Sequence, residues 1–132
     1  APWLATSFII QKLNDKNLPG VKFTEVSYRP KGSIYYARIP KFDSQACGGI
    51  QIEITDRNSF KPLETATTIL ILLQQLHPLE FQWEKNNYID KLFGTNQLRI
   101  TASQNKPADH LPAIWYQDVY EFSDFRKPFL IY

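Results

Sequence analysis

The chain has 132 residues, of which 43% are hydrophobic and 21% charged, and its formal net charge is +2. This balance is typical of one globular domain that buries roughly two thirds of the surface of its unfolded chain. The near-neutral charge gives no reason to expect a nucleic-acid partner, and no apolar run approaches the ~20 residues of a membrane span.

The first half of the chain predicts one helix and two strands. Apolar residues at helical spacing predict a helix over residues 6–17, and the Leu-Pro-Gly sequence that follows ends it. Alternation of apolar and polar residues predicts strands over 21–28 and 50–55. The intervening residues 29–46 are irregular, with a short strand expected at Tyr35 and Tyr36. A connection of this length usually has a function or covers another part of the molecule.

The second half predicts mainly helices. Residues 62–76 begin with a proline, which a first helical turn tolerates, and are apolar enough for a central core helix. We expect a short strand at 81–84, short helices at 88–93 and 96–102, and a longer helix over 107–122 in which Pro112 is an irregularity. The apolar residues 128–132 are expected to dock against another surface.

Helices and strands mix without a regular βαβ rhythm, so the predicted fold class is α+β. We expect a small mixed or antiparallel sheet packed against the central helix 62–76 and further helices. The absence of methionine and the abrupt start at Ala1 predict that the chain is either a piece of a longer protein or a processed product.

The single cysteine, Cys47, precedes two glycines at the start of a strand. A catalytic cysteine needs a base that lowers its pKa, and neither His77 nor His110 has a spacing that suggests such a pair. One cysteine and two scattered histidines are also too few for a metal site. We therefore expect Cys47 to be a small buried residue, with Gly48 and Gly49 allowing a positive φ or a close backbone approach.

The basic, tyrosine-rich segment 28–41 is the strongest candidate for ligand binding. Its rings can stack on flat ligand faces, and its arginines can bind carboxylates or phosphates. An anionic sugar, a peptidoglycan fragment or single-stranded nucleic acid would fit, nucleic acid least well because the rest of the chain is near neutral. The alternative is a solvated edge on which Lys and Arg block strand pairing. The spacing of the acidic residues singles out no carboxylate pair of the kind that glycosidases use.

Several short motifs follow one another in the order found in a known family. They are APW (1–3), LNDKNLPGVKF (13–23), CGGIQIEITDR (47–57), FKPLET (60–65), LHPLEFQW (76–83), DKLFGTNQLR (90–99), Trp115 and FRKPFLIY (125–132). Each motif is weak alone, but the ordered set covers essentially the whole chain. The sequence resembles the C-terminal domain of the exo-β-N-acetylmuramidase family, formerly a domain of unknown function.

The resemblance implies that residues 1–132 are one accessory domain at the C-terminal end of a longer glycoside hydrolase. An N-terminal Rossmann-like domain, absent here, would carry the catalytic glutamates, and the substrate cleft would lie between the two domains. The parent enzyme would release N-acetylmuramic acid from the non-reducing end of peptidoglycan fragments, without a cofactor, after export to the periplasm or cell envelope. This domain alone would not be catalytic.

The residues expected to contact the sugar are in the N-terminal segment and the basic loop. The predicted substrate-binding residues are Trp3, Arg29, Tyr35, Tyr36 and Arg38, with an arginine meeting the lactyl carboxylate of the sugar. The predicted wall of the cleft is Cys47, Gly48 and Gly49. Two alternatives remain: a non-catalytic carbohydrate- or peptidoglycan-binding module, and a purely structural domain.

Overall fold

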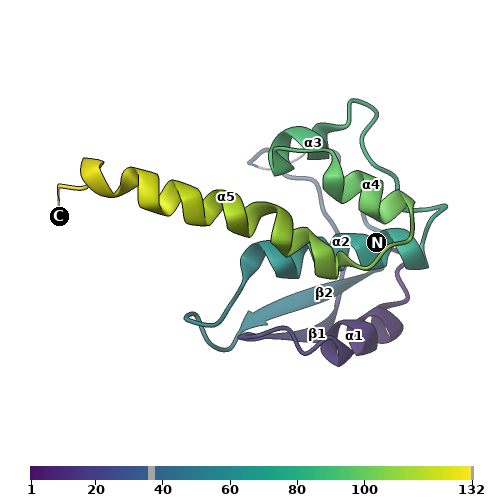
Figure 1. Cartoon of the computed structure of the whole chain (residues 1–132). Coiled ribbons are helices and arrows are strands. Elements are labelled where there is room, and N and C mark those ends of the chain that lie inside the picture. The colour runs from purple at the N-terminus through teal and green to yellow at the C-terminus, as the bar shows by residue number, and fades with distance from the viewer. Residues whose placement is uncertain (36–37, 132) are drawn as a thin grey trace.

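The structure, a computed structural model, describes residues 1–35 and 38–131. In chain order its elements are α1 (Thr6–Asp15), β1 (Val21–Tyr28), β2 (Cys47–Ile54), α2 (Pro62–Leu76), α3 (Tyr88–Phe93), α4 (Gln97–Ser103), the 3₁₀ turn η1 (Ala108–His110), α5 (Leu111–Arg126) and the 3₁₀ turn η2 (Lys127–Phe129). In Figure 1, α2 crosses the middle of the molecule, the two strands and α1 lie below it, α3 and α4 lie above it, and α5 projects to one side. This arrangement confirms the predicted α+β class.

The sheet consists of two antiparallel strands, with Val21 opposite Ile54 and Tyr28 opposite Cys47. Asn14 of α1 lies beside the edge of β1 that β2 leaves unpaired. Its side chain donates to the carbonyl of Phe23 and accepts from the amide of the same residue, at 3.2 and 3.3 Å. The side chain thus takes the place of a third strand at this edge, where free backbone groups would otherwise invite pairing with another chain.

Helix α2 separates two hydrophobic clusters. One, on the side of the sheet, is built around Ile9, Leu13 and Phe23, and the other around Ile71, Leu98, Ala102, Ala108 and Leu111. The predicted bounds and central place of this helix are therefore correct. Its fully buried residues are Thr65, Thr67, Thr68 and Ile71, whereas Leu63 is half exposed. Burial of Thr67 is tolerated because its hydroxyl donates to the carbonyl of Leu63, at 2.8 Å.

Three local predictions are wrong. Residues 81–84 form no strand; they follow a turn closed by the amide of Phe81 and the carbonyl of His77, 2.8 Å apart. Tyr35 lies in a turn rather than a strand, and Tyr36 is outside the described residues. The last long helix begins at Leu111, not at 107, because Pro112 belongs in a first turn, where its missing N–H costs no hydrogen bond.

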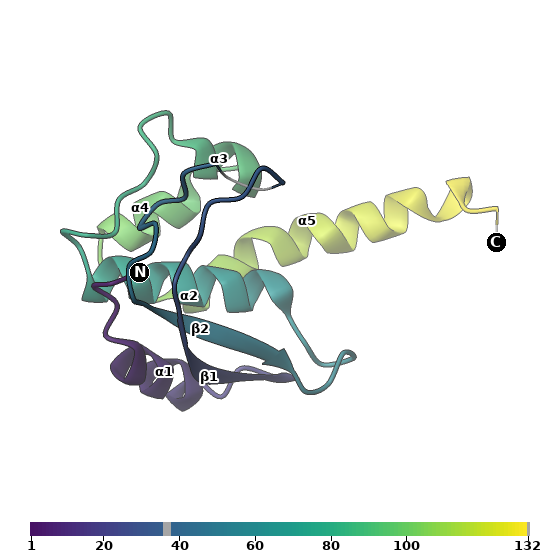
Figure 2. The same cartoon turned by 180° about the vertical axis from the view of Figure 1, so that it is seen from behind.

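The C-terminal residues 128–131 have no docking site within the described part of the chain: Phe129 is 71% exposed and Ile131 is 96% exposed. Tyr132 lies outside the described residues, so docking of this end against another surface stays a prediction. Figure 2 shows α5 leaving the body and extending into solvent. Within residues 1–35 and 38–131, no helix is long and apolar enough to cross a membrane.

Candidate functional site

The N-terminal segment pairs with the start of β2. The backbone nitrogen of Ala1 donates to the carbonyl of Gly48 at 2.7 Å, and the amide of Gly48 donates to the carbonyl of Ala1 at 3.1 Å. Trp3 then lies against His77, at the C-terminal end of α2, with ring centroids 5.0 Å apart. Residues 1–3 are therefore held against both the sheet and the central helix.

Cys47, Gly48 and Gly49 allow close packing where the N-terminal residues meet the start of β2. Cys47 is a free, fully buried thiol, and neither glycine has a positive φ. A Cβ on Gly48 would lie 2.2 Å from the Thr6 hydroxyl oxygen, and one on Gly49 would lie 3.0 Å from the ring of Tyr28. Of the two roles predicted for the glycines, close approach is the correct one. A role for these three residues as the wall of a cleft shared with another domain stays a prediction.

Replacing Gly48 by alanine is expected to destabilise the domain by about 1–3 kcal/mol, the usual cost of overpacking. The new methyl group would collide with Thr6, which is buried and β-branched and so has little rotamer freedom to move away. Gly49→Ala should cost less, because the end of the Tyr28 ring can shift. Urea unfolding of the two variants measures the difference in the free energy of unfolding. Equal losses would show that the contact with Thr6 is not what excludes a side chain at position 48.

Hydrogen bonds join the two arms of the loop that connects β1 to β2. The Arg29 guanidinium donates to the carbonyl of Ser44 at 3.0 Å, and the amide of Ser44 donates to the carbonyl of Pro30 at 2.7 Å. Nearer the tip, the amide of Gly32 donates to a carboxylate oxygen of Asp43, at 3.2 Å. These bonds hold the two arms of the loop together, and Figure 2 shows the loop running from the sheet past α2.

The tip of this loop carries a small hollow of about 240 Å³, lined by Gly32, Ser33, Ile34 and Arg38. A Cβ on Gly32 would lie 2.1 Å from the carbonyl oxygen of Arg38, so the arms touch here. Tyr35, which follows Ile34 in sequence, is 84% exposed. Arg38 thus lines the hollow at the tip, while Arg29 lies at the base. In the part of the chain that the structure describes, no hydrogen bond or ring contact joins Trp3 to any of the three.

A second site was missed by the sequence analysis. Where α5 leaves α2, a hollow of about 240 Å³ is lined mainly by apolar side chains together with one cation and one carboxylate. The lining residues are Phe60, Lys61, Pro62, Leu63, Glu64, Trp115, Tyr116 and Val119. An adjacent hollow of about 300 Å³ shares Trp115 and also contains Asp118.

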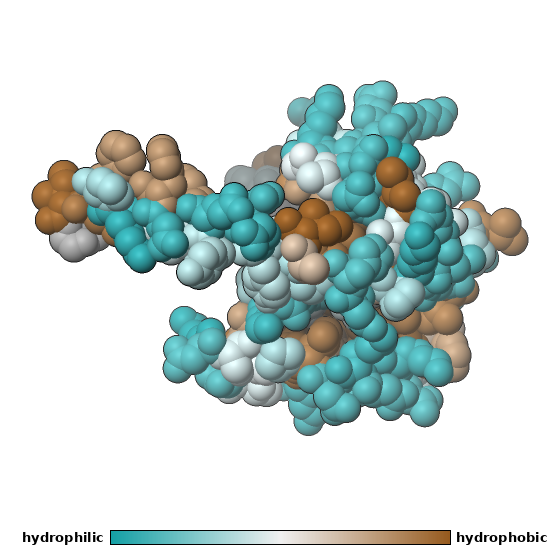
Figure 3. Space-filling view, in the orientation of Figure 1, coloured by the Kyte–Doolittle hydropathy of each residue, from teal (hydrophilic) through white to brown (hydrophobic). Residues whose placement is uncertain are grey.

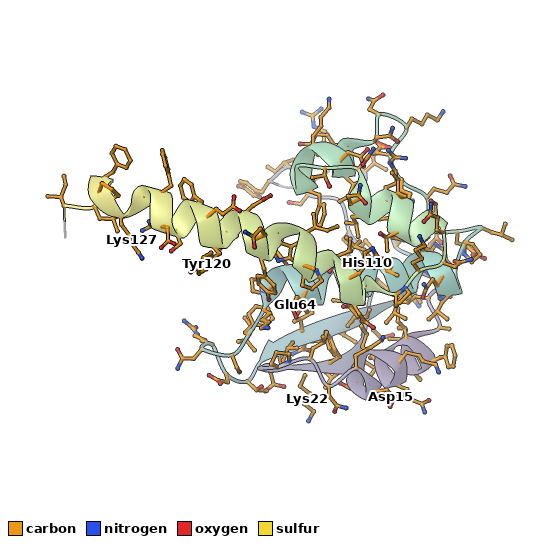
Figure 4. All side chains as sticks on the ribbon, viewed as in Figure 1. Asp15, Lys22, Glu64, His110, Tyr120 and Lys127 are labelled. Carbon is orange, nitrogen blue, oxygen red and sulfur yellow. The ribbon has the colours of Figure 1, made fainter. Side chains whose placement is uncertain are left out.

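The polar groups of this second site bind one another. The Tyr116 hydroxyl donates to Glu64, and the Lys61 ammonium lies 3.3 Å from the same carboxylate and 5.5 Å from the Tyr116 ring. The hydrogen bonds to Tyr116 and Glu64 raise the pKa of Lys61, which stays cationic. Glu64 is labelled at this junction in Figure 4. The sequence signal that could have indicated this site is the pair Trp115 and Tyr116. The Trp115 ring packs on the core, and the Tyr116 hydroxyl then reaches Glu64 on α2.

Several carboxylates in the described residues are held in contacts. Asp90 binds Arg99 through both oxygens, with a shortest distance of 2.6 Å, and Glu25 accepts from Ser7 at 3.0 Å. Hydrogen bonds from Ser59 and Asn58 lower the pKa of Asp56, which is the opposite of what a general acid needs. No cluster of three or more His, Cys, Asp or Glu side chains able to hold a metal ion occurs in residues 1–35 and 38–131.

Comparison with known proteins gives three concordant results. The family model described as "Exo-beta-N-acetylmuramidase NamZ, C-terminal" matches residues 1–132. The peptidoglycan beta-N-acetylmuramidase NamZ of Bacillus subtilis (strain 168) is 27% identical over 132 residues, which are the whole of this chain and 30% of the relative. A crystal structure of a DUF1343 family protein from Bacteroides fragilis NCTC 9343 superposes with a TM-score of 0.81 and 23% identity.

That superposition covers 100% of this chain and 34% of the B. fragilis chain, so it supports the fold described above. The chain spans about a third of the length of both proteins. Because the family model matches every residue from 1 to 132, the chain belongs to the family of the C-terminal domain of exo-beta-N-acetylmuramidase NamZ.

Proposed function

We propose that this chain is the C-terminal domain of a longer glycoside hydrolase that releases N-acetylmuramic acid from the non-reducing end of peptidoglycan fragments. The observation that carries the proposal is the family match over the whole chain. The matched relative of B. subtilis is named a peptidoglycan beta-N-acetylmuramidase, and more than two thirds of it lies outside the matched region. We place the catalytic glutamates in that other part, as an N-terminal domain, and the enzyme in the periplasm or cell envelope, where its substrate occurs.

The test of this function is product analysis with the full-length protein and purified peptidoglycan fragments. The expected product is free N-acetylmuramic acid, released one sugar at a time from the non-reducing end. Binding of the fragments without release of sugar would instead favour a carbohydrate-binding module. Neither binding nor release would favour a purely structural domain.

Within this function, the role of the domain is to complete the substrate cleft, and Arg38 is the residue we assign to the lactyl carboxylate. N-acetylmuramic acid carries that carboxylate at neutral pH, so its site should offer a cation beside an apolar surface. The loop tip offers Arg38, the hollow beside it and the exposed ring of Tyr35. Arg29 is less suited because its guanidinium already donates to the carbonyl of Ser44. Trp3, held against His77, would line the sugar from the N-terminal segment.

Arg38→Ala in the full-length enzyme is expected to lower kcat/KM for a muramic acid glycoside by about 10- to 100-fold. The reason is the loss of a charge-assisted hydrogen bond worth ~1.5–3 kcal/mol. The same variant should leave the corresponding N-acetylglucosamine glycoside nearly unaffected, because that sugar has no lactyl group. Lys31→Ala is the matched control, since it removes one charge from the same loop. An equal effect of Arg38→Ala on both glycosides, or an effect no larger than that of Lys31→Ala, would remove Arg38 from the site.

A further inference from the structure

Helix α5 has one apolar face that begins in the core and ends in solvent. Leu111 is fully buried in the cluster around Ile71, and Trp115 packs against the same cluster. Asp118 takes the next position on this face, and beyond it three phenylalanines follow at spacings of three and four residues, the last of them in the 3₁₀ turn η2 that continues α5. They are Phe122, Phe125 and Phe129, and they are 60%, 67% and 71% exposed. We call these three residues the aromatic stripe.

The rest of the surface of this helix carries polar groups beside the exposed side chains of Val119 and Tyr120. Gln117 donates to Glu121 at 2.6 Å, and Lys127 pairs with Asp124 at 2.6 Å. Tyr120 and Lys127 are labelled in Figure 4. In Figure 3, apolar residues gather at the far end of α5, separated from the body by a more polar section. The side of α5 that packs on the core through Leu111 and Trp115 thus continues as exposed phenyl rings, which have no core of this domain beneath them.

A second copy of this chain would be a poor occupant of the aromatic stripe. A phenylalanine or tyrosine buries ~150–250 Å², so three rings about two thirds exposed offer on the order of ~400 Å², or ~800 Å² for two copies. Stable interfaces between separate chains bury ~1,200–2,000 Å² in total. A partner in the same polypeptide needs less area, because covalent linkage gives effective concentrations in the millimolar range.

We propose that the aromatic stripe is the docking surface for the part of the same polypeptide that precedes this domain. The relatives carry about twice as much chain outside the matched region as within it, which is ample to cover one exposed helical face. Because α5 is anchored in the core through Leu111, docking on the stripe would fix the orientation of the two parts. The proposal rests on the proposed place of this chain in a longer enzyme, and not on the substrate of that enzyme.

The test compares Phe125→Asp with Tyr120→Asp in the full-length protein. Both residues are aromatic, are about two thirds exposed in this domain, at 67% and 68%, and lie on opposite faces of α5. Neither change should unfold the domain itself. Hydrogen exchange of residues 119–129 is expected to be ~10-fold or more faster in Phe125→Asp than in wild type, and unchanged in Tyr120→Asp. Calorimetry should show one unfolding transition becoming two in Phe125→Asp alone.

Two results would overturn the proposal. One is equal exchange and equal melting of the two variants, which would mean that nothing covers the stripe. The other is a full-length dimer in light scattering that Phe125→Asp converts to a monomer, which would make a second copy the occupant. Neither readout needs a substrate, so a full-length protein without muramidase activity would refute the proposed function while leaving this docking surface intact.

Discussion

Residues 1–132 alone are expected to hydrolyse a chromogenic muramic acid glycoside no faster than buffer does, while the full-length enzyme exceeds that rate by ~10⁶-fold or more. A glycosidase needs two carboxyl groups on either side of the bond it cleaves. In the described residues, Glu64 already binds both Lys61 and Tyr116, and Asp118 lines the other of the two hollows that share Trp115. The acid that shares a hollow with Glu64 is Asp109, in a space of about 50 Å³, and Asp109 already pairs with Lys16 at 3.7 Å.

Release of the chromophore, followed by absorbance, measures both proteins under the same conditions. Glu64→Gln and Asp118→Asn are the control variants, because these two acids lie in the two hollows that Trp115 lines. Turnover by the isolated chain that either substitution abolishes would place catalysis inside this domain. The proposal that the catalytic residues lie outside residues 1–132 would then be wrong.

Ile71→Ala is expected to lower the free energy of unfolding by about 2–5 kcal/mol, the usual cost of emptying a buried aliphatic site. Ile71 is 2% exposed and packs in one cluster with Leu98 and Leu111, so its loss leaves a cavity bordered by three elements. Leu63→Ala, on the same helix but half exposed, should cost under ~1 kcal/mol. Urea unfolding measures the free energy of unfolding of both variants. Similar losses would mean that the buried face of α2 is not the centre of the hydrophobic core.

The regular elements were predictable because their signals are local. Helices α2 and α3 have the bounds that hydrophobic spacing and flanking prolines and glycines indicate. The start of α5 was misplaced because Pro112 was taken for an irregularity inside the helix, whereas a proline that a helix cannot hold in its interior marks its first turn. Residues 81–84 were misread because four residues of alternating apolar and polar character are too few to identify a strand; the hydrogen bond from the amide of Phe81 to the carbonyl of His77 shows a turn there instead.

The candidate site was less predictable, since it depends on contacts between distant segments. Tyr116 binds Glu64 across 52 positions of sequence, and no local pattern indicates that pairing. The basic loop was identified from its composition, but composition did not show that Arg29 staples the loop while Arg38 lies at its tip. The exposed half of α5 reads in sequence as ordinary helix, because an apolar face looks the same whether its partner is present or absent.

The most direct test of the account compares the full-length enzyme with the same enzyme lacking residues 1–132. The measured quantity is kcat/KM for release of N-acetylmuramic acid from peptidoglycan fragments, with calorimetry used to select conditions in which the shortened protein is folded. If this domain completes the substrate cleft, the folded, shortened enzyme should lose ~100-fold or more in kcat/KM, because substrate positioning contributes that much or more to catalysis. A folded, shortened enzyme with the same kcat/KM as the full-length protein would contradict the account.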